Sequence, residues 1–293
     1  NPYLTLTPVL RWSYYNRKPT TDNNDKFGLA SRSDSKVTPG ITLTLSPSKQ
    51  LSFYASVQTG YRPPFLDELY TSIEYPEFGM YSVVLPNPDL KPEESINVEI
   101  GVNGDYKSLF SDSDRFVFHA NVFRDRVKNL INAGATDDGD MILYYSIDNV
   151  GKALKTGFEA SADYYPGNAD FHLSYGYLHA EDKNTGEKIP GLTPMQATLR
   201  AGYTYKPWNV NGWYRMRLFK GGKSNLETAR NSGEYKQLGG FATHTLGLTW
   251  KPQIKDWADF TLTFSVDNIT NKKFRYLNGG YGVGRSYRAW LSA

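Results

Sequence analysis

The sequence predicts an all-β protein, a transmembrane antiparallel β-barrel of which about twelve strands are present in these 293 residues. Three observations support this prediction. Apolar and polar residues alternate in about a dozen separate stretches, which indicates strands with one apolar and one polar face. Short and long connections alternate between these stretches, which is typical of an outer-membrane barrel. Aromatic residues make up 15% of the chain, as expected where Tyr and Trp gather at both membrane interfaces.

The alternation places each strand and assigns its two faces. In residues 96–103, Ile96 and Val98 alternate with Asn97 and Glu99, so the first pair is predicted to face lipid and the second pair the lumen. By the same parity, Phe264 faces lipid. The predicted strands cover residues 3–15, 38–45, 51–58, 96–103, 116–122, 158–164, 171–177, 197–203, 214–218, 246–250, 262–266 and 287–291.

The connections between these strands are predicted to be short at one end of the barrel and long at the other, extracellular end. The strands of a soluble β-sandwich also alternate apolar and polar residues, but a sandwich rarely alternates short and long connections over so many hairpins. Residues 124–153 are predicted to form a long strand pair extending above the membrane. The short connections lie near residues 46–49, 165–169, 206–209 and 252–258, and the long ones near 17–36, 62–93, 181–193, 220–239 and 270–284.

Composition excludes several other classes of protein. No window approaches 18 consecutive apolar residues, so a helical membrane span is excluded, whereas the polar average is compatible with a barrel. A net charge of +3 is too small to indicate nucleic acid binding. The absence of cysteine is permissive for the periplasm and the outer membrane. No signal peptide precedes the first strand, so we expect a mature or truncated chain.

Two proline-rich boxes stand out between Gly60 and Gly101. The first reads GYRPPFLDELY over residues 60–70, and the second reads NPDLKPE over residues 87–93. Proline fixes φ and lacks a backbone donor, so these boxes are predicted to end one strand, shape a long loop and begin the returning strand. The box residues are therefore expected to be chiefly architectural. They include Tyr61, Arg62, Pro63, Pro64, Asn87, Pro88, Asp89 and Leu90.

Both boxes resemble the paired "YRPP…ELY" and "NPDLKPE" motifs of TonB-dependent outer-membrane receptors. Further matches follow in order: NVGKA at 149–153 with TGFE at 156–159, PGLTP at 190–194, VDNITNKKF at 266–274 and GRSY at 284–287. Each match is weak alone, but their order is specific. One departure is the C-terminus, which is Ala293 where members of the family usually end in an aromatic residue.

The resemblance implies that residues 1–293 are the C-terminal part of a barrel of about 22 strands, with the plug domain and N-terminal strands absent from this chain. It implies a receptor in the outer membrane of a Gram-negative bacterium that imports an iron-bearing ligand. The implied partners are a TonB-type energy-transducing complex acting through the plug, the lipid bilayer and lipopolysaccharide, with no nucleic acid. A monomer without catalytic residues, resident cofactor or metal is expected.

The amino-acid sequence of the first box is most similar to that of the haem and haemoprotein branch of the family. That branch typically carries a haem-ligating His in the loop between the boxes, yet residues 65–86 contain none. His119, His172, His179 and His244 all fall in predicted strands. The candidate ligand-binding residues are therefore those of the loop and its rim, which could ligate or stack on haem or a ferric chelate: Arg62, Glu68, Tyr70, Tyr75, Met80 and Tyr81.

Alternatives remain at each of these positions. The tyrosines could simply pack the loop, and Arg62 could form an ion pair with Glu68 or Glu94. Acidic residues around Gly139 are predicted to form an exposed turn rather than a calcium loop, because no further ligand stands at the right spacing. Among functions, haem import leads. A ferric-siderophore or cobalamin receptor of the same family comes next, followed by a passive 12-stranded pore and, last, an outer-membrane enzyme.

Overall fold

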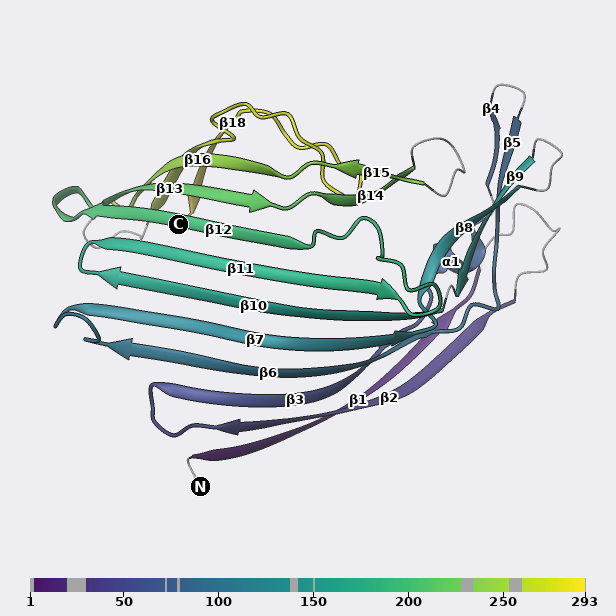
Figure 1. Ribbon diagram of the computed structural model, residues 1–293, viewed down its shortest axis with the longest axis horizontal. Helices are drawn as coiled ribbons and strands as arrows, with labels where there is room; N and C mark the ends of the chain where they lie inside the picture. The colour runs from purple at the N-terminus through teal and green to yellow at the C-terminus, as the bar shows by residue number, and fades with distance from the viewer. Residues whose placement is uncertain are drawn as a thin grey trace.

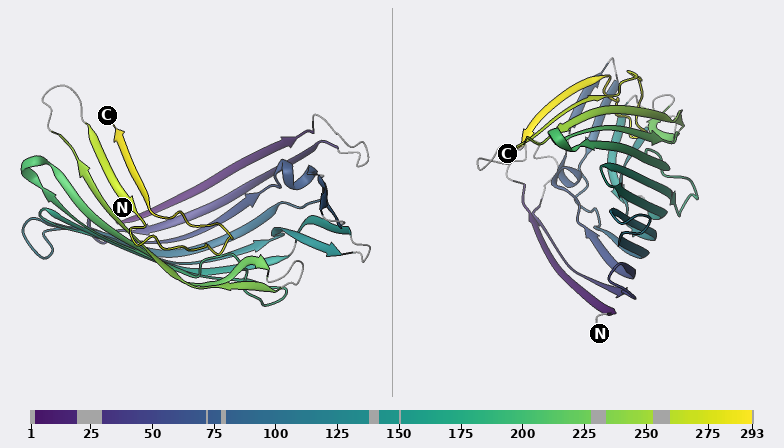
Figure 2. Two further views of the ribbon diagram at one scale, coloured as in Figure 1. Left: turned by 90° about the horizontal axis from the view of Figure 1, so that it is seen from above. Right: turned by 90° about the vertical axis from the view of Figure 1, so that its left-hand side faces the viewer.

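Twelve strands form a single antiparallel sheet in the computed structural model, which describes residues 3–19, 30–71, 73–77, 80–137, 142–149, 151–227, 234–252 and 260–292. The sheet curves around a hollow, with β1 and β18 as its two edges (Figures 1 and 2). Its strands in sheet order are β1 (Leu4–Arg17), β2 (Arg32–Leu45), β3 (Leu51–Arg62), β6 (Glu93–Lys107), β7 (Asp114–Lys128), β10 (Lys152–Pro166), β11 (Ala169–Asp182), β12 (Met195–Tyr205), β13 (Val210–Phe219), β16 (Phe241–Trp250), β17 (Thr261–Asp267) and β18 (Ser286–Ser292).

Each of the twelve predicted stretches corresponds to one of these strands, and only Tyr3 lies outside, one residue before β1; this confirms the all-β, partial-barrel prediction. The strands are mostly longer than predicted. For example, β6 covers Glu93–Lys107 where alternation indicated 96–103. The apolar side chains mark only the part of a strand that crosses lipid, whereas the backbone ladder continues beyond it, where both faces are polar.

The two faces of the sheet differ as the parity predicted. Val98 and Phe264 are 41% and 50% exposed on the apolar face. On the opposite face, Glu99 accepts hydrogen bonds from Tyr54 and Asn121, and Thr245 is 2% exposed. Side chains converge on the concave side of a curved sheet and diverge on the convex side. The buried small polar residues therefore line the concave face, and the exposed apolar residues cover the convex face.

The connections also divide by length between the two ends of the sheet, as predicted (Figure 1). Short turns follow β2, β10 and β12, at the predicted places. A fourth, at residues 108–113, was not predicted. The predicted turn at 252–258 lies almost wholly outside the described residues. The long connections carry α1 (Leu66–Tyr70), β4 (Ile73–Glu77), β5 (Met80–Leu85), β8 (Ile131–Asp137), β9 (Ile142–Asn149), β14 (Gly222–Glu227) and β15 (Tyr235–Leu238).

The region predicted as a long strand pair at 124–153 is more complex than that. Its two ends belong to β7 and β10 of the main sheet, and its centre forms the hairpin of β8 and β9. This hairpin joins the hairpin of β4 and β5, so that a second, four-stranded sheet has the order β4-β5-β9-β8. Strands β5 and β9 run parallel, with Tyr81 opposite Ile142. Across the described part of the chain, no helix has the length and apolar character needed to cross a membrane.

Candidate ligand-binding platform at the loop end

The two loops that follow β3 and β7 form one unit at the loop end of the sheet, which we call the platform: residues 63–92 and 129–151 as far as they are described. It contains α1 and the four-stranded sheet (Figure 1). This unit contains the whole loop in which the sequence placed the ligand-binding candidates. It lies at the end of the sheet that carries the long connections (Figure 1).

Arg62, the last residue of β3, holds the base of the platform through two carboxylates. Its Nη1 lies 2.9 Å from both Glu68 carboxylate oxygens, and its Nε and Nη2 donate to the two oxygens of Glu93 at 2.8 and 2.7 Å. The structure thus confirms the expected pair with Glu68, but the second partner is Glu93 rather than Glu94. Glu94 pairs instead with Lys36 at 2.6 Å.

Register explains this correction. Arg62 lies opposite Glu93 across the β3–β6 ladder, so both side chains leave the sheet on the same face. Burial by itself raises the pKa of Glu93, but the hydrogen bonds from Arg62 and from the Ile131 backbone N–H outweigh it, and the net pKa is lowered. The same two carboxylates raise the pKa of Arg62, so it remains charged. This arrangement connects β3, α1, β6 and the start of β8.

The short helix α1 seals a small apolar core against the second box. The Glu68 carboxylate also accepts the Phe65 backbone N–H at 2.7 Å, which caps the start of the helix. Leu69 is 0% exposed and packs with Leu90, at 1%, and Ile131, at 9%. Pro63 and Pro64, which precede α1, are also buried. The boxes therefore fold onto each other, as their architectural interpretation predicted.

Two asparagines fasten the second box to the loop after β7. Asn87 Nδ2 donates to the Ile147 carbonyl at 2.9 Å and to the Asp148 carboxylate at 2.8 Å. Asn149 Oδ1 accepts the Lys91 N–H at 2.7 Å, and its Nδ2 donates to the Lys91 carbonyl at 2.8 Å. Asn149 opens the third family motif, so these bonds bring the second and third motifs together in space.

The ligand-binding candidates are divided between the base and the upper part of the platform. Arg62 and Glu68 lie at the base and form an ion pair with each other. Tyr70 Oη donates to the Ala30 carbonyl at 2.9 Å and so reaches the loop after β1. The backbone of β4 carries Tyr75, and that of β5 carries Met80 and Tyr81. Their side chains lie outside the described part of the structure.

All four histidines lie in main-sheet strands, as predicted, and none belongs to the platform. Each has a polar neighbour: His119 bonds to Asn103, His172 to Asp163, His179 to Glu181 and His244 to Tyr214. In the described residues, no group of His, Asp and Glu side chains is arranged to hold a metal ion. Most of the acidic turn around Gly139 lies outside the described residues.

Sequence reasoning missed two features of this site. Glu93 was overlooked although its parity matches that of Glu99 on the lumen face. The parallel pairing of β5 with β9 had no sequence signal, because the two strands lie about sixty residues apart along the chain.

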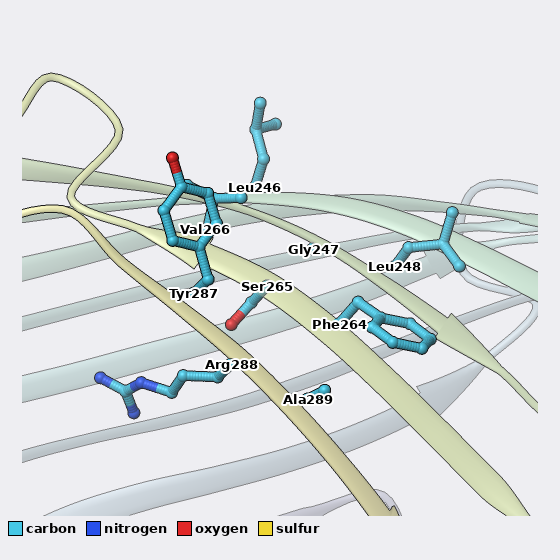
Figure 3. A pocket seen from close by; sticks show the side chains of 9 residues that line it. All are labelled: Leu246, Gly247, Leu248, Phe264, Ser265, Val266, Tyr287, Arg288 and Ala289. Carbon is cyan, nitrogen blue, oxygen red and sulfur yellow. The ribbon is translucent and has the colours of Figure 1, made fainter.

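A depression of about 500 Å³ on the outer face lies away from the platform, over β16, β17 and β18 (Figure 3). Its apolar lining comes from residues such as Leu246, Leu248 and Phe264, which are among the exposed residues of the convex face. This surface faces the acyl chains of the membrane, so it is a contact for lipid rather than an entry for a polar ligand.

Comparison with known proteins agrees with the fold and the motifs. Residues 1–269 match the family described as TonB dependent receptor-like, beta-barrel. The heme/hemopexin utilization protein C of Haemophilus influenzae (strain 86-028NP) is 24% identical over 93% of this chain and 38% of its own length. The vitamin B12 transporter BtuB of Photobacterium profundum is 26% identical over 72% of this chain and 31% of its own length.

A similar fold is found in a mutant of the ferric enterobactin receptor PfeA from Pseudomonas aeruginosa. Its TM-score is 0.71 at 19% identity, covering 99% of this chain and 42% of that one. This chain therefore spans less than half the length of each of these three proteins. The family match covers most of the twelve-stranded sheet and the whole platform. The chain belongs to the family of TonB-dependent receptor β-barrels, which lie in the outer membrane of Gram-negative bacteria.

Proposed function

We propose that the chain is the C-terminal part of a receptor barrel that imports haem, either free or taken from a haem-carrying protein. The observation that carries this proposal is the match to the heme/hemopexin utilization protein C across 93% of the chain, a span that includes the platform as well as the strands. The first box, whose sequence resembles that of the haem branch, leads into the same platform.

The architecture supports a binding and gating role rather than bond chemistry. The Arg62 ion pairs tie the platform to the barrel, and Asn87 and Asn149 tie its two loops to each other. The platform therefore holds β4 and β5 in place above the lumen. In this proposal Tyr75, Met80 and Tyr81 ligate or stack on the porphyrin, and haem is cargo rather than a resident cofactor. No catalytic residue is assigned.

Import against a gradient needs energy, which the outer membrane does not supply. We propose that a plug domain outside this chain occupies the lumen and that a TonB-type complex displaces it through the periplasm. The β1 and β18 edges leave room for the further strands of a 22-stranded barrel. The whole receptor is proposed to act as a monomer.

A ferric-siderophore or cobalamin receptor is the second candidate. It is favoured by the similarity to the vitamin B12 transporter and by the absence of His from residues 65–86. A passive 12-stranded pore is less favoured, because the observed sheet has two open edges instead of a closed ring.

The deciding experiment is a spectroscopic titration of the full-length, detergent-solubilised receptor with haemin. A saturable Soret shift is expected, and ferric siderophores and cobalamin should not compete. Binding of a siderophore or cobalamin with no Soret shift would overturn the haem proposal and leave the receptor class in place.

The ligands can be located with single substitutions in the same assay. Tyr75→Phe and Tyr81→Phe each remove a phenol oxygen and keep the ring, so the variant that loses ligation should change the Soret position. Tyr165→Phe is the matched control, because Tyr165 lies beside the short turn at the opposite end of β10. Unchanged spectra in both platform variants would exclude Tyr75 and Tyr81 as phenolate ligands.

A further inference from the structure

Three arginines lie next to one another on the concave face of β12 and β13. Arg215 lies opposite Thr245, a buried residue of that face, and Arg217 follows two residues later on the same side of β13. Arg200 lies opposite Arg215 on β12. We call these three side chains the luminal arginine row. Residues in such neighbouring positions are about 5–7 Å apart, so their positive charges repel one another.

The carboxylates beside this row are already paired, and none of them reaches Arg217. Asp170 forms an ion pair with Arg200, and Asp267 lies 3.3 Å from Arg215 Nη2. Within the part of the chain that the structure describes, Arg217 has no ion-pair partner, and its buried Nε has no hydrogen-bond acceptor. A guanidinium in this position loses hydration without gaining an acceptor, so a bound anionic group would stabilise it.

Four aromatic rings, which we call the aromatic cluster, lie at the loop end of the row. Phe219 follows Arg217 by two residues and so shares its face, and its ring stacks on that of Phe241 on β16 with centroids 4.8 Å apart. Phe274 stacks on Phe241 at 4.1 Å, and the edge of Tyr276 meets both of these rings. All four rings are half-buried. The wall therefore presents flat apolar rings first, and cations beneath them, to a molecule that enters from the loop end.

A depression of about 410 Å³ lies where the cluster meets the row, lined by Arg217 and Phe219 on β13. Its other lining residues come largely from β10, β11 and β12 and include the small polar side chains of Ser174 and Thr198. Glu159 lines it on β10, three strands away from β13. A ligand with all its negative charge at one edge would turn that edge toward Arg217 and away from Glu159, and would place its apolar part against Phe219.

We propose that the aromatic cluster and the luminal arginine row form a track along which an anionic cargo built on aromatic rings passes through the lumen after it leaves the platform. Haem has this chemistry, because its carboxylates lie at one edge of a flat apolar ring. For the identity of the cargo, this inference rests on the proposed function. The aromatic rings stack on the porphyrin, and Arg217 and then Arg215 bind its carboxylates as the plug moves away from this wall. The track is separate from the platform, which captures the cargo first.

The test separates capture of haem from its passage. Haemin binding to energy-depleted cells that carry the full-length receptor measures capture, and uptake of haemin by energised cells measures passage. The variants are Arg217→Gln, which removes the unpaired charge, and Arg217→Lys, which keeps it. Arg11→Gln is the matched control, because Arg11 lies opposite the buried Thr38 on the same concave face but belongs to the edge strand β1. All variants are first checked for a folded barrel by heat-modifiable migration in gels.

Arg217→Gln should slow haemin uptake about tenfold, as expected for the loss of one charge-assisted hydrogen bond, while capture stays at the wild-type level. Arg217→Lys should retain part of the uptake, and Arg11→Gln should behave as the wild type. Wild-type uptake by Arg217→Gln would overturn the track. So would an equal loss of capture and uptake in that variant, which would place Arg217 in the site of first binding, or an equal loss of uptake in Arg11→Gln, which would show a general effect of luminal charge.

Two other cargoes keep this result distinct from the identity of the ligand. If the receptor imports ferric enterobactin, an anionic catecholate, in place of haemin, the haem proposal fails, and a selective loss of uptake in Arg217→Gln would still support the track. If the receptor imports cyanocobalamin, which carries no net charge, both the haem proposal and the anionic track are overturned.

Discussion

Asn149 and Lys91 are joined by a reciprocal pair of hydrogen bonds. The Asn149 side chain accepts the Lys91 N–H at 2.7 Å and donates to the Lys91 carbonyl at 2.8 Å. Its Nδ2 also lies 2.8 Å from the Asn129 carbonyl. One side chain thus satisfies backbone groups of both platform loops and connects them.

Replacing Asn149 with Ala should loosen the platform without unfolding the barrel. The substitution leaves three backbone groups without their partner, which we expect to cost roughly 1–3 kcal/mol locally. Proteolysis of the two loops should accelerate, while heat-modifiable migration stays normal. Asn103→Ala is the control, because Asn103 bonds to His119 in the main sheet. Equal proteolysis of the two variants would show that Asn149 does not hold the loops together.

Substitutions at Arg62 can separate its architectural role from direct ligand contact. If Arg62 only supports the platform, Arg62→Ala, Glu68→Gln and Glu93→Gln should all weaken ligand binding to a similar degree. If Arg62 binds an anionic ligand, removing either carboxylate should preserve or strengthen binding while Arg62→Ala abolishes it. We expect the first pattern, because three guanidinium nitrogens already bond to carboxylate oxygens. Arg62→Lys should rescue only partly, since lysine lacks the planar fork.

Acid should release the base of the platform. Glu93 begins β6, ahead of the apolar run that starts at Ile96, and its pKa is lowered in the folded protein. Its contribution to stability is therefore complete above the ordinary carboxyl pKa of about 4.3 and is lost as the pH falls through the lowered value. Proteolysis of the platform, measured with an acid-active protease, should increase across that range in the wild type.

The Glu93→Gln variant controls for other acid effects. It lacks the titrating group, so its platform should already be cleaved faster than that of the wild type just above the ordinary carboxyl pKa, and its cleavage should change less on further acidification. A wild-type profile that parallels that of the variant would assign the pH response to other groups.

The twelve main strands could be predicted because lipid and water impose different residues on alternate positions. The alternation of apolar and polar residues is lost where a strand no longer separates lipid from water. In the platform, neither face meets lipid, so β4, β5 and their pairing with β9 left no periodic signal. The distance along the chain between Tyr81 and Ile142 also gives no local clue to their pairing.

The Arg62 pairing, by contrast, could have been predicted in full. Parity already placed Glu99 on the lumen face, and Glu93 is six residues away on the same strand and so shares that face. Glu94 must point to the other side. The prediction of Glu94 as a partner did not apply the side-chain period to this end of the strand.

Gly157, in the third family motif, should tolerate no side chain. A Cβ there would lie 2.3 Å from Phe123 Cζ and 2.6 Å from the Tyr177 backbone oxygen. The aromatic ring could move, but the carbonyl belongs to the adjacent strand β11 and is fixed by the ladder. Gly157→Ala should therefore reduce the heat-modifiable fraction of the purified receptor. Gly212→Ala is the matched control, because a Cβ at that position would have no other atom within 4 Å. Normal assembly of both variants would contradict the close approach at Gly157.

The orientation of the sheet in the bilayer can be tested with single charges. Val98 and Phe264 are exposed on the convex face, so Val98→Arg or Phe264→Arg should destabilise the folded receptor by about 2–4 kcal/mol near the membrane midplane. Asn97→Arg places the same charge on the lumen face one residue away and should cost much less, because that surface is polar. The measurement is reversible unfolding of the full-length receptor in lipid bilayers with guanidinium chloride. A larger loss for Asn97→Arg than for Val98→Arg would mean that the two faces are reversed.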